Sequence, residues 1–341
     1  MNKRKIFKIM TSAFLISMLV SGCTNVKKLS SSEKTKVMNK IYNYSSTEKE
    51  GLDGLDNLIK SNIDQFNIKE RDEMVNIYIS NMFNFMDNLN NKLYCLGFEL
   101  EDVVEQYKIN VNDEASFNSI PKEHATIKGF LQEVKSKGFS LEAGNKNSNY
   151  TITVNLEKVN EKYGKYISES LKRYLEFNNY EINSNIQVID DNKKTVNLDE
   201  VIKRIKKIEA GMDIDKKQSY EFADKWTSSL EYYYNILFGI SHNYFIETEY
   251  FNSNILKQYK DIIESNKNTD MSKKLSKVVN VLEKNNRKFD SNTKVQIENI
   301  INEIYTKDIK DAINKKYPEQ ISNDSVSYTH LRAHETLRYL V

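Results

Sequence analysis

Histidines are the first candidates for chemistry in this chain, which contains 4 of them among 341 residues. His330 and His334 are four residues apart, so on a helix both imidazoles would lie on one face and can share a metal ion. Glu335 follows directly, but this order matches neither H-E-x-x-H nor H-x-x-E-H, and the stretch supplies no third ligand. We therefore predict no metal site and no cofactor.

His242 is the next candidate, because Glu247 and Glu249 follow it and a histidine–carboxylate pair can exchange protons with a substrate. A lone histidine followed by surface carboxylates is more typical of an interaction at a helix end. The pattern therefore assigns no catalytic residue.

Two polar stretches resemble calcium-binding loops. Residues 145–149 alternate asparagines as such a loop alternates ligands, but Leu156 stands where the bidentate glutamate is needed. Residues 213–224 fail in the same way, and there we expect Asp215 or Ser219 to cap the following helix.

Cys23 offers a different chemistry, which is covalent attachment. The preceding residues 1–22 combine a basic start with the apolar run 9–20, which is shorter than the roughly 20 residues that cross a bilayer. This arrangement predicts a cleaved secretory signal peptide over 1–22. The residues Val20 to Cys23 resemble the lipobox of bacterial lipoproteins, which implies cleavage before a diacylated Cys23 and an extracytoplasmic protein anchored to the cell membrane. Residues 23–33 are polar and predict a flexible tether.

Composition limits the fold and the partners. The chain is 39% hydrophobic and 29% charged, and it has only 10 glycines and 2 prolines, which favours long helices over many tight turns. The formal net charge is +2, and four positive charges lie in the signal peptide, so the cleaved chain offers no basic footprint and we expect no nucleic-acid partner. Cys95 has apolar neighbours and is expected to be buried.

Apolar spacing predicts a mainly α fold of antiparallel helical hairpins. A small β-hairpin is expected near 139–154, where apolar residues alternate with polar ones. Two helix–turn–helix units align loosely in the C-terminal half, which predicts a solenoid-like array similar to tetratricopeptide repeats. The predicted regions are 34–137 (helical), 138–197 (β-hairpin plus helices) and 198–317 (helical-hairpin array). The predicted helices are 52–66, 74–96, 99–107, 123–137, 156–163, 167–177, 198–209, 220–242, 248–265, 271–285 and 293–315.

The last residues, 327–341, differ in composition from the rest of the chain. They resemble a translated adaptor peptide that ends unrelated predicted proteins. We interpret 327–341 as a non-native tail that contributes nothing to folding.

Aromatic residues are densest between residues 220 and 251. One helical stripe, Phe222 to Tyr244, has the spacing of a buried face and is expected to form core. Aromatic rings outside such a stripe can stack on a ligand. The candidate binding surface consists of Tyr232, Tyr234, Phe238 and Tyr244.

The stretches SLEAGNKNSNYTITVN, EKYGKYISESLKRYLEF, VIKRIKKIEAGM and SLEYYYNILFGI resemble poorly characterised helical lipoproteins of Gram-positive-type spore-forming bacteria, over roughly residues 120–305. The resemblance implies location and fold but no catalytic residue. We therefore expect an interaction or ligand-binding module, whose partner is an envelope protein, a peptide or wall glycan. The alternative is a cell-envelope enzyme, for example a wall hydrolase.

Overall fold

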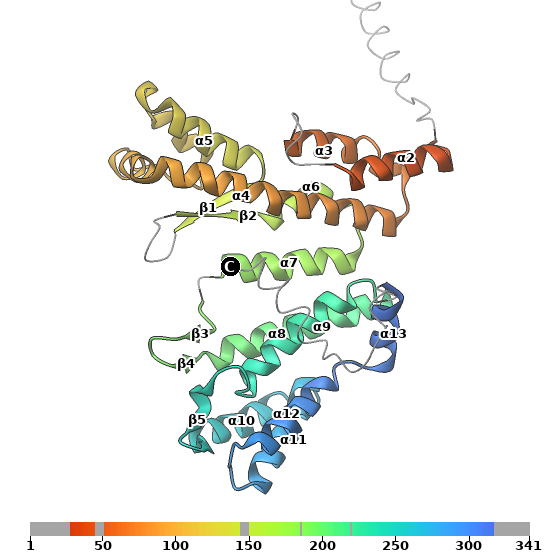
Figure 1. Cartoon of the computed structure of the whole chain (residues 1–341), viewed down its shortest axis with the longest axis vertical. Helices are drawn as coiled ribbons and strands as arrows, with labels where there is room; N and C mark the ends of the chain where they lie inside the picture. Colours follow the sequence, from red (N-terminus) through yellow and green to blue (C-terminus); the bar gives the residue numbers. More distant parts are fainter. Residues whose placement is uncertain (1–27, 45–50, 144–149, 185, 219, 317–341) are drawn as a thin grey trace, which may run out of the picture.

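A computed structural model describes residues 28–44, 51–143, 150–184, 186–218 and 220–316. Figure 1 shows helices stacked in layers along the long axis, with the N-terminal half above α7 (Glu169–Asn183) and the C-terminal half below it. The prediction of a mainly α fold with a small β-hairpin is confirmed. The signal peptide, Cys23, the loop 145–149 and the tail 327–341 lie outside the described residues.

The N-terminal layer consists of α2 (Ser31–Tyr42), α3 (Gly51–Lys60), α4 (Ile68–Gln106) and α5 (Ala125–Ser136). Helix α2 begins at Ser31, inside the segment 23–33 for which a flexible tether was expected. Ser30 caps this helix through a reciprocal capping box: its hydroxyl accepts from the backbone N–H of Glu33, and the Glu33 carboxylate accepts from the N–H of Ser30.

Gly97 interrupts α4 without ending it. Its φ of 40° and ψ of −124° are open to glycine and kink the helix where the sequence predicts a stop. Cys95 is exposed, so its predicted burial is wrong. Buried or half-buried leucines recur in steps of three or four residues through this part of α4, and position 95 falls on the opposite side together with Tyr94 and Phe98, which are 88% and 83% exposed.

The predicted β-hairpin is present as β1 (Phe139–Ala143) and β2 (Tyr150–Val154), which pair antiparallel with Leu141 opposite Ile152. β2 packs on α4 and β1 on α5, so the apolar face of the hairpin is buried. Two further hairpins have strands of two residues each: β3 (Ile189–Asp190) with β4 (Thr195–Val196), and β5 (Ile246–Glu247) with β6 (Tyr250–Phe251). Such short strands leave no alternating pattern, so the sequence did not predict them.

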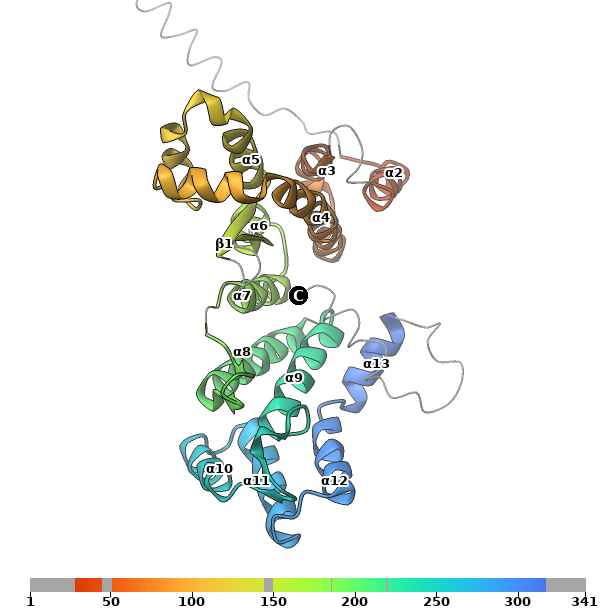
Figure 2. The same ribbon diagram turned by 60° about the vertical axis from the view of Figure 1, so that its left-hand side comes forward.

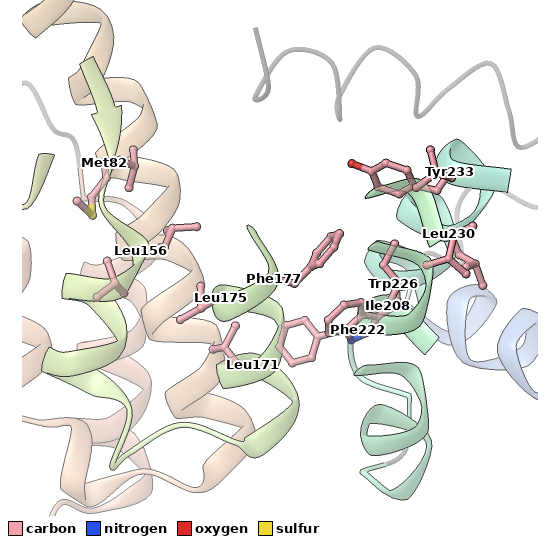
Figure 3. Packing of buried hydrophobic residues seen from close by; sticks show 14 of the residues in the cluster. Met82, Leu156, Leu171, Leu175, Phe177, Ile208, Phe222, Trp226, Leu230 and Tyr233 are labelled. Carbon is pink, nitrogen blue, oxygen red and sulfur yellow. The ribbon is translucent and has the colours of Figure 1, made fainter. Parts of the chain in front are cut away.

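Helices α6 (Leu156–Tyr163) and α7 (Glu169–Asn183) connect the two halves. Figure 3 shows that Leu171 and Leu175 of α7 face the N-terminal half, whereas Phe177 faces the pair formed by α8 (Leu198–Lys217) and α9 (Ala223–Leu237). One continuous cluster of buried apolar side chains therefore passes through α7 from one half to the other.

The C-terminal layer contains the helical hairpins predicted over 198–317. α8 packs on α9, α10 on α11 and α11 on α12, while α12 and α13 also return to pack against α9 (Figure 2). In a linear solenoid each unit contacts only its neighbours, so this return departs from solenoid stacking. The helices are α8 (Leu198–Lys217), α9 (Ala223–Leu237), α10 (Ser253–Ser265), α11 (Asp270–Lys284), α12 (Ser291–Asn302) and α13 (Lys307–Lys316).

Trp226 lies at the centre of the contact between α7, α8 and α9. Its indole is fully buried and packs edge-on against Tyr174, with ring centroids 5.4 Å apart, and tilted against Phe177 at 5.7 Å. On the α8 side the ring lies directly on Gly211, where a Cβ atom would overlap the indole carbons. The absence of a side chain at Gly211 is what lets α8 and α9 approach this closely.

Candidate binding groove

The four aromatic residues of the predicted binding surface do not form one surface. Tyr234 and Phe238 are fully buried and stack on each other with ring centroids 5.1 Å apart, so their predicted exposure is wrong. Only Tyr232, which is 48% exposed, and the half-buried Tyr244 reach solvent. The reason is that α9 is contacted by α8, α12 and α13, which cover more than the single face that its apolar stripe reveals.

The candidate acid–base pair at His242 is not formed. The His242 ring lies beside Tyr244, with ring centroids 5.4 Å apart, and makes no ion pair with Glu247 or Glu249 among the described residues. Glu247 instead accepts a hydrogen bond from Asn252, the N-cap residue of α10, at 2.5 Å. Within the described ranges no three His, Cys, Asp or Glu side chains gather as a metal site would require. His330 and His334 lie outside those ranges.

A buried ionic network surrounds Arg204. Its guanidinium donates from Nε to Glu200 and from Nη1 to Glu181, both at 3.1 Å, and from Nη1 to the Tyr233 hydroxyl at 2.8 Å. It also donates from Nη2 to the backbone carbonyl of Ile186 at 3.2 Å. All three charged side chains are more than nine-tenths buried. Arg204 thus ties the end of α7 and the segment after it to α8 and α9.

Burial and hydrogen bonding shift the pKa values of the two carboxyl groups of this network in opposite directions. Burial raises the pKa of Glu181 and outweighs the hydrogen bond from Tyr233 and the charge of Arg204. Burial also acts to raise the pKa of Glu200, but hydrogen bonds from Tyr180 and Arg204 exceed it and leave this pKa below its ordinary value.

Other buried carboxyl groups also hold elements together. Burial raises the pKa of Asp215, which accepts from the Ser170 hydroxyl at 2.7 Å and from the backbone N–H of Phe222 at 3.0 Å. Asp215 therefore holds the turn between α8 and α9, but it lies inside α8. The N-cap residue of α9 is Phe222, which has no side-chain cap, so the predicted capping of α9 by Asp215 is wrong, and Ser219 lies outside the described residues. Burial likewise raises the pKa of Glu209, which accepts from the Tyr234 hydroxyl at 3.0 Å. These carboxyl groups are occupied by the fold itself.

An open hollow with a volume of about 840 Å³ lies elsewhere, between α8 and α10. We call it the α8–α10 groove. Leu198 and Ile202 of α8 and Ile262 of α10 contribute its apolar part. The polar part comes from Asp199, Lys203, Lys206 and Lys207 on α8, from Gln258, Asp261 and Ser265 on α10, and from Asn266 just after α10.

Lysines give one wall of the α8–α10 groove its positive charge. Lys206 and Lys207 make no ion pair with any described residue, and Lys203 has one carboxylate near it, Glu200, at 3.7 Å. The Lys203 and Lys207 ammonium groups lie 4.8 and 4.4 Å from the ring centroid of Tyr180, which holds them at this wall. Three lysines therefore line this wall, and the Tyr180 ring restricts the positions of two of them, Lys203 and Lys207.

Sequence reasoning missed this groove, although the spacing of lysines in the sequence is one signal of it. Lysines at positions 203, 206 and 207 are three and four residues apart and share a helix face, and no acidic residue stands one turn from Lys207. The helix facing them starts more than forty residues later, so the sequence gives no indication that α8 and α10 meet.

Comparison with models of protein families, with curated proteins and with solved structures gave no significant match. Among the helices of the described residues, none combines the length and the apolar character that crossing a membrane requires. The geometry of the α8–α10 groove is thus the basis for a functional conclusion.

Proposed function

We propose that this protein is a lipid-anchored, extracytoplasmic helical module that binds a partner at the cell envelope through the α8–α10 groove. The lipobox resemblance of Val20 to Cys23, after a basic and then apolar start, supports the anchor. Two acyl chains on one cysteine would hold the chain at the membrane, because each buried methylene contributes about 0.8 kcal/mol.

The observation that carries the binding role is the groove itself, in which lysines, two of them restricted by the Tyr180 ring, stand beside apolar side chains. A pocket that combines an apolar lining with a few placed polar groups is the usual form of a ligand site. The carboxyl groups whose pKa burial raises, among them Glu181 and Glu209, are absent from the groove lining. Asp199 and Asp261 do line the groove, but a general acid of a wall hydrolase needs a raised pKa, so this separation favours binding over the alternative of a hydrolase.

The anchor is tested by Cys23→Ala, which removes the sulfur that would carry the lipid. We expect the wild type in the membrane fraction of the native host and the variant outside it, because no described helix could replace the anchor. Fractionation followed by mass spectrometry of the intact chain measures both location and acylation. A Cys23→Ala variant that remains in the membrane fraction at the processed mass would contradict the anchor.

Binding in the groove is tested by photocrosslinking in intact cells. A benzophenone amino acid at Ser265, which is exposed and lines the groove, is expected to form an adduct with a specific partner on irradiation. The control position is Lys284, which is exposed at the end of α11 and outside the groove lining. Equal adducts from both positions, or none from Ser265, would count against the groove as the site.

A further inference from the structure

Resting on the proposed function, we infer that the α8–α10 groove takes a peptide segment of a partner protein in which acidic residues stand beside apolar ones. The inference joins three features of the groove: lysines that have no carboxylate partner among the described residues, an apolar part, and an α10 wall that carries a carboxylate and amides instead of cations.

The lysines of the groove select for a ligand with negative charge. Lys206 and Lys207 have no carboxylate partner among the described residues, and their stems lie along the same wall as Lys203. A carboxylate of the ligand would complete these ion pairs, and the partly enclosed groove strengthens such pairs relative to open water. The Tyr180 ring has already restricted Lys203 and Lys207, so less side-chain entropy is lost when an anion binds.

The apolar part selects for a ligand that also has apolar side chains. Leu198, Ile202 and Ile262 lie along the groove, whose α8 wall runs from Leu198 to Ala210. At 1.5 Å per residue this wall is about 18 Å long, which matches five or six residues of extended chain or about twelve residues of helix. Leu198 and Ile202 are each only 8% exposed, and Ile262 is half-buried, so they offer a narrow apolar strip. Burial of apolar area contributes about 25 cal/mol per Å², so leucine-sized side chains that cover this strip would add to the affinity.

The α10 wall distinguishes a peptide from a uniform polyanion such as a polyphosphate. Asp261 on this wall and Asp199 at the end of the groove would repel a ligand with negative charge all along its length. A peptide has backbone N–H groups that can donate to these carboxylates, and its amides can pair with Gln258 and Asn266. The mixed wall therefore favours a peptide over an anionic polymer.

The test measures binding of labelled peptides to the full-length chain in detergent by fluorescence anisotropy. The probe is a twelve-residue peptide of leucine and glutamate with leucines at helical spacing. We expect it to bind more tightly, by about tenfold or more, than the same peptide with lysine for glutamate or with glutamine for leucine. Its affinity should fall as salt is raised.

The paired substitutions Lys206→Glu and Lys207→Glu are expected to weaken probe binding by about tenfold or more, because they place negative charge on the wall that the glutamates contact. The matched control is Lys216→Glu with Lys217→Glu, the same charge change on the exposed end of α8 and outside the groove lining, which should alter binding by less than about twofold. Circular dichroism checks that both variants keep their helix content.

Three results would overturn the inference: equal binding of the leucine-free peptide, no loss with the groove pair, or displacement of the probe by polyphosphate at comparable affinity. These failures are distinguishable from a failure of the proposed function. If an adduct still forms from Ser265 in cells while the peptide does not bind, the groove is a binding site for another ligand class. If the adduct is absent as well, both proposals fail.

Discussion

Replacing Trp226 by alanine is expected to lower the free energy of unfolding by about 3 to 5 kcal/mol, as truncation of a large buried aromatic residue does. The indole fills the space between α7, α8 and α9, where Tyr174 and Phe177 pack against it. Helices α7 and α9 also pack against other helices on their remaining faces. The three helices therefore cannot move together far enough to fill the space left by the ring.

The measurement is urea unfolding followed by far-ultraviolet circular dichroism, since the variant loses the only tryptophan. Tyr232→Ala is the matched control on the same helix, because Tyr232 is 48% exposed and, within the part of the chain that the structure describes, its ring touches one other ring, that of Tyr233. We expect it to cost about 1 kcal/mol or less. Similar losses for both variants would show that Tyr232 belongs to the core, which is contrary to the structure.

Arg204→Met is expected to cost about 3 to 5 kcal/mol, because it leaves Glu181 and Glu200 buried without their cation. The methionine stem replaces much of the packing of the arginine, so the loss reports mainly on charge. The matched control is Arg173→Met on the exposed side of α7, which breaks ion pairs with Glu169 and Glu176 in solvent and should cost about 1 kcal/mol or less.

A second variant separates charge from shape in the Arg204 network. Adding Glu181→Gln and Glu200→Gln to Arg204→Met removes the uncompensated charges and is expected to restore much of the lost stability. Urea unfolding at constant pH and salt measures all of these variants. A triple variant that is less stable than Arg204→Met alone would show that the carboxylates stabilise the fold by hydrogen bonding rather than by pairing with the arginine.

Helix positions were predictable where a single apolar face governs packing. The expected helix 156–163 agrees with α6 at both ends, because Asn155 caps it and its apolar residues face one neighbour. The expected helix 293–315 is divided into α12 and α13, since residues 303–306 turn while the apolar spacing continues across them. Spacing reports which face is buried, but it does not report whether the backbone turns.

The candidate site was less predictable for a physical reason. Tyr234 and Phe238 were expected at the surface because they lie off the stripe, yet α9 has neighbours on several sides and buries them. The α8–α10 groove depends on the distance between two helices from different hairpins, and hydrophobic periodicity within either helix carries no information about that distance.

Because Gly211 lies so close to Trp226, substitutions at these two positions are expected to be coupled in evolution. While an indole occupies position 226, any side chain at position 211 would overlap its ring carbons, so Gly211 cannot change alone without moving α8 away from α9. A smaller residue at 226 would open the space that an alanine or serine at 211 could fill. In sequences that share this fold, substitutions at the two positions should therefore appear together, and such covariation would reveal the α8–α9 contact even where overall similarity is weak.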